Sequence, residues 1–444
     1  MKKASALVAG LAYLCGATAA QSACNVPIVT ISHTGSTSPN ANAKQLIFVD
    51  NTQYPLAKCN DGSPAAFVLR RGLNTASNRW IIDLQAGSSC YTQAGCLLRW
   101  QTDTSNGTEP AQLTGTEYWG TAAAPNKKAL ADIMEDDAGI LSPSSDTNPD
   151  FWDATVVRVL YCSSDNFYGG GAAQGAFSPS NPATWNFQGR AIIAAVVHTL
   201  INQYGLNSAS EVMLSGTSSG GVGTYFNIND TAAILPSGSR FVAMGDSGFY
   251  DSTVPAYNKK SKIAPYLGPD PTSEQVMLQD SFNMWQGYGD KNCATQAQSP
   301  AQAELSCRDV SYLLNQGYIQ VPTYIIQSVY DSWQLPVAEG IATCVLYNNC
   351  APVTSQTIAQ STYDAYFADD MMNLIVTSQK SSPTAATVLQ FPTHIITTNA
   401  SFTSPITLQS SNQNSTVAAI FGLWYRNPCS ITDDGIVESQ FGYQ

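Results

Sequence analysis

Histidine and charged side chains are scarce in this 444-residue chain, which has only three histidines and 12% charged residues. Its 20 Lys and Arg residues are outnumbered by 32 Asp and Glu residues, and the formal net charge is −12. No basic stripe occurs, which argues against nucleic acid or an anionic membrane surface as a partner. No CxxC pair or compact Cys/His cluster occurs in the sequence, so it predicts no zinc site. We therefore expect neither a metal ion nor an organic cofactor.

Long hydrophobic runs are missing after the first 20 residues. Met1-Lys-Lys precedes an apolar run from residue 6 to residue 20 that ends in small side chains, which is the pattern of a secretory signal peptide. No later stretch has the roughly 18 or more consecutive apolar residues of a transmembrane helix, so we expect no membrane span. The sequence predicts a signal peptide at 1–20 and export of the mature chain to the extracellular space or the periplasm.

The cysteines fit an exported chain. Cys15 lies in the leader, and the remaining ten of the 11 cysteines form an even set, which indicates five disulfides. Short spacing favours three local pairs: Cys90/Cys96, Cys293/Cys307 and Cys344/Cys350. Four cysteines remain for long-range bridges of open connectivity: Cys24, Cys59, Cys162 and Cys429.

Apolar runs alternate with helical periods along the mature chain. Five runs have the length and composition of buried strands: 80–84, 155–161, 211–215, 240–244 and 322–328. The stretch at 187–204 has the apolar period of a helix. This alternation predicts an α/β fold with a mostly parallel central sheet flanked by helices. We expect one catalytic domain over 21–444, with helical insertions at about 252–320 and 335–385.

Further elements are expected towards the ends of the domain. Apolar runs at 46–49 and 66–69 flank a turn-forming stretch and predict a hairpin. Residues 394–398 fit either a late strand or a loop, and residues 419–425 predict a closing helix.

The pattern G-x-S-x-G occurs as Gly216-Thr-Ser-Ser-Gly220. An apolar strand precedes it and a segment able to form a helix follows, which is the context of a nucleophile elbow. The glycines permit a turn so sharp that the Ser218 side chain protrudes. The same residues can form an ordinary glycine-rich turn, because the pattern is short and the chain has 32 glycines. The flanking strand favours Ser218 as a nucleophile.

A serine nucleophile needs a base, and the scarcity of histidine narrows the choice. His33 lies in a polar lead-in, and His198 falls inside the helical stretch at 187–204. Only His394 lies downstream of Ser218, as the order serine, acid, histidine of α/β-hydrolases requires. The alternative for His394 is a surface histidine after a Pro-Thr turn. We interpret His394 as the general base.

The carboxylate that orients this base should follow a strand between Ser218 and His394. Fourteen acidic residues fall in that interval, so we select among them by their position relative to the predicted strands. Asp331 comes just after the run at 322–328, and Asp246 follows the run at 240–244. Position favours Asp331 as the acid, with Asp246 as the alternative.

An oxyanion needs N–H donors. The N–H of Ser219 directly follows the expected nucleophile. A second donor is expected from Gly87 or Ser88, in the stretch that follows the run at 80–84. The same stretch can also be an ordinary turn that is closed by Cys90/Cys96.

Six motifs follow one another in a fixed order: Cys59-Asn-Asp-Gly-Ser-Pro64, Asn148-Pro-Asp-Phe-Trp152, Tyr161-Cys-Ser-Ser-Asp165, Gly216-Thr-Ser-Ser-Gly-Gly221, Gly245-Asp-Ser-Gly-Phe249 and Tyr330-Asp331. Together they resemble the pectin acetylesterase/Notum family of secreted carboxylesterases. The resemblance covers residues 45 to 400, and several motifs in register are more specific than any one of them.

The resemblance implies an α/β-hydrolase-like fold and assigns the site residues of the family to this chain. It implies a nucleophile, an acid and a base: Ser218, Asp331 and His394. It implies that the oxyanion hole is formed by Gly87, Ser88 and the N–H of Ser219. It also implies a disulfide that ties the Cys59 region to Cys162.

The chain departs from this family at one place. The family usually has Glu-Gly-Gly-Trp before a cysteine, whereas this chain has Gln85-Ala-Gly-Ser-Ser-Cys90. A glycine is kept, but glutamate has become glutamine and a large aromatic residue at the mouth of the cleft is absent. The departure bears on the substrate that the resemblance implies more than on the reaction that it implies.

We therefore expect a secreted serine esterase that forms an acyl-enzyme. By the resemblance, its substrate is an acetylated cell-wall polysaccharide such as pectin, although a net charge of −12 does not help an anionic polymer to approach. Removal of a longer acyl chain from a lipid or a lipid-modified protein is the alternative within this class. A non-catalytic glycan-binding relative and a peptidase are the alternatives from other classes. We expect a monomer that acts on acylated small molecules or polysaccharides.

Overall fold

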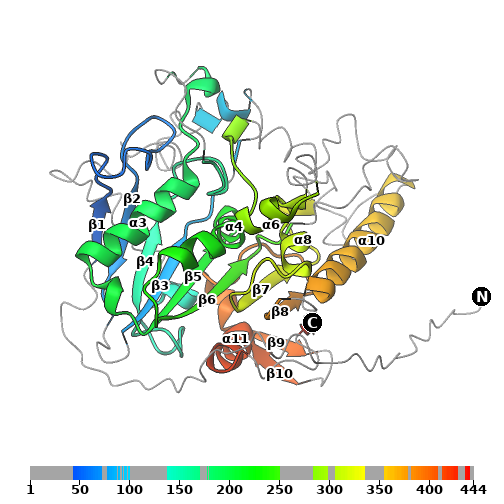
Figure 1. Cartoon of the computed structure of the whole chain (residues 1–444). Helices are drawn as coiled ribbons and strands as arrows, with labels where there is room; N and C mark the ends of the chain where they lie inside the picture. Colours follow the sequence, from blue (N-terminus) through cyan, green and yellow to red (C-terminus); the bar gives the residue numbers. More distant parts are fainter. Residues whose placement is uncertain are drawn as a thin grey trace, which may run out of the picture.

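The computed structural model of the chain describes most residues between Lys44 and Gln440 (Figure 1). The described residues are 44–72, 78–87, 89–90, 93, 95–97, 99–100, 138–170, 178, 180–250, 284–298, 306–335, 355–378, 382–408, 413–428 and 436–440. The expected signal peptide at 1–20 lies outside them. Four candidate disulfide cysteines also lie outside them: Cys24, Cys344, Cys350 and Cys429.

The described strands form one eleven-stranded sheet with the order β1-β2-β4-β3-β5-β6-β7-β8-β11-β9-β10. Its strands are β1 (Lys44–Phe48), β2 (Ala66–Arg70), β3 (Arg79–Leu84), β4 (Thr155–Val159), β5 (Glu211–Thr217), β6 (Arg240–Asp246), β7 (Thr323–Ser328), β8 (Thr384–Leu389), β9 (Pro405–Leu408), β10 (Asn414–Thr416) and β11 (Ile436–Gln440). Pairing is parallel from β4 to β11 and antiparallel at both edges. The predicted mostly parallel sheet is confirmed.

Helices connect and cover these strands. The described α-helices are α3 (Gly189–Gln203), α4 (Ser219–Ile234), α6 (Lys291–Gln296), α8 (Val310–Asn315), α10 (Ser355–Ser378) and α11 (Val417–Arg426). Short 3-10 helices are η3 (Gly139–Leu141), η4 (Pro182–Thr184), η5 (Leu206–Ser208) and η9 (Ala400–Phe402). In Figure 1, α11 lies beside β9 and β10 below the central strands, whereas α3 and α4 lie across them.

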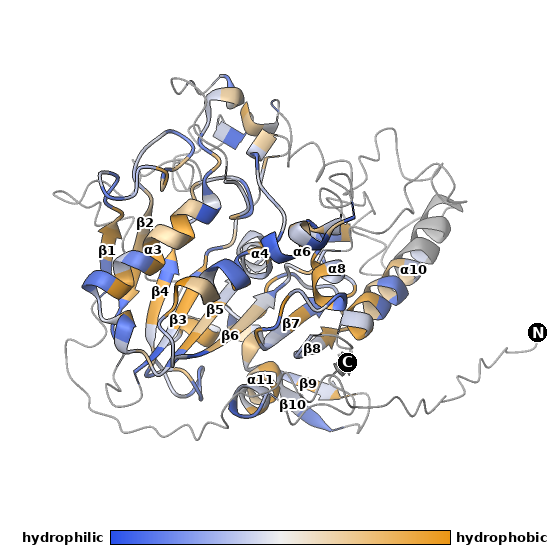
Figure 2. Ribbon diagram, in the orientation of Figure 1, coloured by the Kyte–Doolittle hydropathy of each residue, from blue (hydrophilic) through white to orange (hydrophobic). Residues whose placement is uncertain are grey.

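Successive residues of a central strand point to opposite faces of the sheet and enter different cores. In β3, Ile82 packs in a cluster with Ile192 and Val196 of α3, whereas the preceding Ile81 packs in a cluster with Phe421 of α11. Such a strand is hydrophobic over most of its length because both of its faces are covered, and the central strands are largely orange in Figure 2. The sheet is therefore the middle layer of three.

A third cluster covers the part of the sheet next to the second half of the chain. Tyr225 of α4, Leu313 of α8 and Met371 of α10 pack there with Ile325 of β7. On the opposite face, α11 contributes the fully buried Trp424. Truncating such a side chain to alanine costs about 3–5 kcal/mol of unfolding free energy. These cores keep the ends of the strands rigid, and the loops of the candidate site begin at those ends.

Most elements lie where the sequence predicts them. The N-terminal hairpin is the antiparallel pair β1/β2, the closing helix is α11, and residues 394–398 form a loop. The sequence did not predict β8, β9, β10 and β11. Thr384 and Ala385, which fell within the expected second insertion, instead begin β8. Alanine and threonine at the start of β8 gave a weak strand signal, and pairing with β7 overrides it.

Three of the expected disulfides are formed among the described residues: Cys59–Cys162, Cys90–Cys96 and Cys293–Cys307. The first joins segments 103 residues apart, as the family resemblance implied. Within the described part of the chain, no helix has the length and apolar character needed to cross a bilayer.

Candidate active site

The turn between β5 and α4 holds Ser218 in a conformation that few residues adopt. Its φ is 54° and its ψ is −119°, and it stands immediately before the first residue of α4. A Cβ atom on Gly220 would overlap the Leu84 carbonyl oxygen, and a Cβ on Gly216 would overlap the Gly220 carbonyl oxygen. Both glycines of the G-x-S-x-G pattern are therefore required by the closeness of the backbone, which is the geometry of a nucleophile elbow.

Ser218, His394 and Asp331 come together at the carboxyl ends of neighbouring strands. The Ser218 Oγ lies 2.9 Å from the His394 Nε2, and the His394 Nδ1 lies 2.9 Å from each oxygen of the Asp331 carboxylate. Asp331 is fully buried, and the His394 side chain is 17% exposed. A hydroxyl, an imidazole and a carboxylate in this order can pass a proton from serine to histidine while the carboxylate holds the ring.

The Asp331 carboxylate is held in place from two directions. The backbone N–H groups of Trp333 and Gln334 donate to Oδ1 at 2.8 and 2.9 Å. The Gln327 side-chain amide donates to Oδ2 at 3.1 Å, and its oxygen accepts from the Phe249 N–H at 3.2 Å. These donors fix the position of the carboxylate.

Asp246, the alternative acid, contacts the histidine loop but not the imidazole. Its Oδ2 accepts hydrogen bonds from the Ile396 N–H (2.8 Å), the Thr397 N–H (2.6 Å) and the Thr397 hydroxyl (2.8 Å). The Ser247 hydroxyl donates to Oδ1 at 2.9 Å. Burial raises the pKa of Asp246 above its usual value, although these donors act in the opposite direction. Asp246 therefore anchors the backbone that carries His394.

Strained residues gather around this anchor. Ser247 and Ile395, like Ser218, have positive φ values, at 54° and 53°. A β-branched residue such as Ile395 is seldom found there, because its side chain collides with the backbone. Its N–H donates to the Ser247 hydroxyl at 3.1 Å, and its carbonyl accepts from the Asn399 amide at 2.6 Å. These bonds hold a conformation that costs about 1–3 kcal/mol, and that conformation sets the direction of the neighbouring imidazole.

The loop after β3 lies beside the first turn of α4. The Ser219 hydroxyl donates to the Gly87 carbonyl, so Gly87 and Ser219 are neighbours as the expected oxyanion hole requires. Ser88 lies outside the described residues. The role of these three residues as donors stays a prediction.

The two changed positions of the 85–90 stretch point into the protein. The Gln85 side-chain oxygen accepts from the Tyr161 N–H at 2.9 Å. Ser89 directly precedes Cys90, where the family has tryptophan, and its hydroxyl donates to the Asn166 side-chain oxygen. Both residues are buried. Gln85 therefore supports the loop from beneath and does not present its amide to the cleft.

Of the other two histidines, the structure places only His198, which does not join Ser218. His33 lies outside the described residues. His198 stacks on Tyr54, with 6.3 Å between the ring centroids and an angle of 8° between the planes. Among the described residues, no group of three His, Cys, Asp or Glu side chains is arranged to hold a metal ion.

Sequence reasoning did not identify several residues that shape the site. Ser247 and Gln327 support the histidine loop and the acid, and Trp333 stacks on the His394 ring at 5.9 Å. Trp333 follows Asp331 by two residues, which was visible in the sequence. No periodicity or motif indicated that its ring would turn back onto a histidine 61 positions away.

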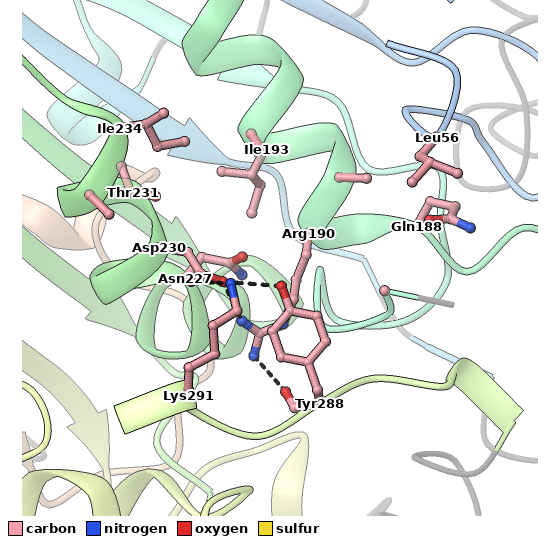
Figure 3. Close-up of a pocket in the computed structure, with 14 residues that line it drawn as sticks. Leu56, Gln188, Arg190, Ile193, Asn227, Asp230, Thr231, Ile234, Tyr288 and Lys291 are labelled. Carbon is pink, nitrogen blue, oxygen red and sulfur yellow. Dashed lines mark hydrogen bonds and ion pairs between the residues drawn. The ribbon is translucent and has the colours of Figure 1, made fainter. Parts of the chain in front are cut away.

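A cavity of about 380 Å³ lies elsewhere, between α3, α4 and α6 (Figure 3). Its charged groups bond to one another: Asp230 accepts from Arg190 at 2.9 Å and from Lys291 at 3.0 Å, and the Tyr288 hydroxyl donates to it at 3.3 Å. Asp230 lies near the opposite end of α4 from Ser218, about 18 Å along the helix. We interpret these polar contacts as structural links between α3, α4 and α6.

A comparison with known proteins adds to this geometry. The family model described as Pectinacetylesterase matches residues 37–434, which is most of the chain. The chain belongs to the pectinacetylesterase family. The family resemblance read from the sequence motifs is thereby confirmed.

Several curated relatives are similar to this pectinacetylesterase-family chain. Palmitoleoyl-protein carboxylesterase notum2 of Xenopus laevis is 29% identical over 300 residues, which is 67% of this chain and 54% of the relative. Pectin acetylesterase 7 of Arabidopsis thaliana is 26% identical over 283 residues, which is 63% of this chain and 60% of the relative. The chain spans about half the length of the first curated relatives that it matches.

A solved structure shows the same fold. The Wnt deacylase Notum from Drosophila aligns with a TM-score of 0.63 and 22% identity, covering 85% of this chain and 92% of that structure. The pectinacetylesterase-family chain and this structure therefore share an α/β architecture.

Proposed function

We propose that this chain is a serine carboxylic ester hydrolase that works through an acyl-enzyme on Ser218. The observation that carries the proposal is the 2.9 Å contact between the Ser218 Oγ and the His394 Nε2, with Asp331 on the other ring nitrogen. Membership of the pectinacetylesterase family supports the same reaction class.

In the first half of the reaction, Ser218 attacks the carbonyl carbon of an ester. His394 takes the hydroxyl proton at Nε2, and Asp331 stabilises the imidazolium through Nδ1–H. The negative charge on the carbonyl oxygen faces the N-terminus of α4, where the Ser219 N–H and the helix dipole favour an anion. We expect Gly87 and Ser88 to supply the other donors.

In the second half, the tetrahedral intermediate collapses and the C–O bond to the alcohol breaks. His394 gives its proton to the leaving alkoxide, which leaves as an alcohol, and the acyl group stays on Ser218. A water molecule then attacks the acyl-enzyme while His394 accepts one of its protons. Return of that proton to the Ser218 Oγ releases the carboxylic acid and restores the enzyme.

We propose an acetylated cell-wall polysaccharide such as pectin as the substrate. The family description and the name of the Arabidopsis relative support this choice. Deacylation of a longer acyl chain is the second candidate, because relatives named palmitoleoyl-protein carboxylesterase are as similar to the chain.

We also propose that the protein is exported, works without a cofactor and is a monomer. Three disulfides among the described residues fit an oxidising compartment. Sedimentation of the purified protein tests the oligomeric state, and N-terminal sequencing of secreted material tests cleavage of the leader.

A panel of p-nitrophenyl esters from acetate to palmitate, run beside acetylated pectin, tests the proposed function. We expect preference for acetate, release of acetate from the polymer, and no turnover by Ser218→Ala. Preference for long chains supports the second candidate instead. Equal turnover by wild type and Ser218→Ala contradicts Ser218 as the nucleophile. No turnover by either contradicts the proposed chemistry and leaves glycan binding as the role.

A further inference from the structure

Three aromatic rings form a stack at the candidate site. The Trp333 ring lies 5.9 Å from the His394 ring at an interplanar angle of 26°, and 5.9 Å from the Tyr250 ring at 23°. Both separations fall within the range of offset stacking. Trp333 therefore contacts both the tyrosine and the imidazole that accepts the Ser218 proton in the proposed mechanism.

The stacked residues come from the loops after three neighbouring strands. Tyr250 follows β6, Trp333 follows β7 and His394 follows β8. Tyr250 is 9% exposed, and Trp333 is half-buried against the core of α4, α8 and α10. The indole thus stacks on both the Tyr250 ring and the imidazole.

Trp333 is also tied to the acid. Its backbone N–H donates to the Asp331 Oδ1 at 2.8 Å, and the same oxygen lies 2.9 Å from the His394 Nδ1. The imidazole therefore meets a carboxylate at its edge and an indole on its face, and both belong to one short segment. Rotation of the imidazole away from Ser218 would break both contacts.

We propose that Trp333 is a positioning residue for His394, and that its indole face favours the imidazolium formed when Ser218 is deprotonated. This inference rests on the proposed function, in which His394 becomes cationic in the transition state. A cation within about 6 Å of an indole centroid is attracted by the negative charge of the ring face. Neutral imidazole lacks most of that attraction, so the contact is stronger in the transition state than in the ground state.

Other charged groups also face the histidine loop. Asp331 contacts the ring from the β7 side, and Asp246 lies behind residues 396 and 397 on the β6 side. The uncharged Ser218 faces the ring from the turn just before α4. Substituting Trp333 removes none of these groups, which separates the effect of the indole from that of the carboxylates.

The test compares Trp333→Leu, Trp333→Phe and Tyr54→Leu. Tyr54 stacks on His198 in the same manner but outside the site, so Tyr54→Leu is a matched control. The readouts are thermal unfolding and the pH dependence of kcat/KM on the best p-nitrophenyl ester. We expect Trp333→Leu to lower kcat about 10-fold and to move the acid limb of the profile down by about 0.5–1 pH unit. Trp333→Phe should fall between it and the wild type, and Tyr54→Leu should match the wild type.

An NMR titration gives a readout that does not need turnover. With three histidines in the chain, the imidazole C–H signals are few, and His394→Ala assigns the signal of His394. The midpoint of that signal should fall in both Trp333 variants. If Trp333→Leu does not fold, the Trp333→Phe midpoint decides.

An unmoved acid limb and an unmoved midpoint overturn the inference, even where kcat falls. An equal shift in Tyr54→Leu also overturns it. These outcomes are distinct from failure of the proposed function, which is read from Ser218→Ala alone.

Discussion

Asp246 ends β6 and Asp331 follows the adjacent strand β7, and both carboxylates are buried beside the loop that carries His394. Asp331 reaches the imidazole with both oxygens, at 2.9 Å. Asp246 reaches the backbone N–H groups of Ile396 and Thr397 instead. One carboxylate holds the ring and the other holds the chain from which the ring projects.

The difference shows that burial and position do not by themselves identify a catalytic acid. Both residues satisfy the rule that site residues follow parallel strands, and both accept several hydrogen bonds. What separates them is the charge of their partner. Asp331 faces a ring that becomes cationic in the proposed mechanism, whereas Asp246 faces neutral peptide groups. The variants below test this division of roles.

Asp331→Asn should give the largest effect. The amide cannot stabilise the imidazolium, and it favours the wrong tautomer of His394, so we expect kcat to fall on the order of 10³- to 10⁴-fold. The fold should persist, because the asparagine oxygen can still accept from the Trp333 and Gln334 N–H groups. Steady-state kinetics and circular dichroism measure both. Near-wild-type turnover in this variant would remove Asp331 from the mechanism.

Asp246→Asn should give a smaller loss of turnover together with a loss of stability. Its amide nitrogen would face N–H donors, so the His394 loop should loosen; we expect kcat to fall roughly 10- to 100-fold and the unfolding free energy to fall by about 1–3 kcal/mol.

Glu211→Gln is the matched control for Asp246→Asn. Glu211 begins β5, at the end of that strand away from Ser218, where it accepts from Arg240 at 3.1 Å and from the Tyr425 hydroxyl at 2.8 Å. The Glu211→Gln variant should have a lower free energy of unfolding and an unchanged kcat. If Asp246→Asn instead loses as much turnover as Asp331→Asn at full stability, the two roles are reversed.

Ser247→Ala should lower turnover less than Asp246→Asn does. Its hydroxyl accepts from the Ile395 N–H and donates to Asp246, so its loss frees one strained residue beside His394. We expect kcat to fall about 3- to 10-fold, corresponding to one hydrogen bond of about 1 kcal/mol. A loss beyond that of Asp246→Asn would mean that Ser247, and not the carboxylate, anchors the loop.

Asp165 is a third buried carboxylate, and we expect it to affect stability but not catalysis. Asp165 accepts from the Ser163 hydroxyl and the N–H groups of Phe167, Gly169 and Gly189, and burial raises its pKa to about 6. Because the folded pKa lies above the unfolded value of 3.8, its contribution to stability is complete below pH 4 and is lost as the pH rises to about 6.

Urea unfolding of wild type and Asp165→Asn between pH 4 and pH 8 measures this contribution. The stability of the wild type relative to the variant should fall by up to about 3 kcal/mol between pH 4 and pH 6, and then stay level. A relative stability that rises over this range would show that the four donors outweigh burial.

Much of the site could be predicted because histidine is scarce. With three histidines, chain order alone selected His394, and the glycines around Ser218 marked the elbow. The acid was harder, because Asp246 and Asp331 each come within three residues after a predicted strand run. Only the path of the loop after β8 decides which carboxylate meets the ring, and that path depends on the strained Ile395.

The remainder depended on tertiary contacts that leave no local signal. The strand pattern predicted the central sheet, but β8 is rich in alanine and threonine and needed its neighbour β7 to be recognised as a strand. Gln85 looked like a change at the cleft, yet its side chain turns inward to Tyr161. The stacking of Trp333 on His394 joins two loops that are distant in the sequence.

Labelling with diethyl p-nitrophenyl phosphate, followed by peptide mass spectrometry, tests the central claim most directly. The account predicts one diethyl phosphate adduct per chain, on the peptide that contains Ser218, formed far more slowly in His394→Ala. An adduct on another residue, or labelling of Ser218 at an unchanged rate without His394, would contradict it.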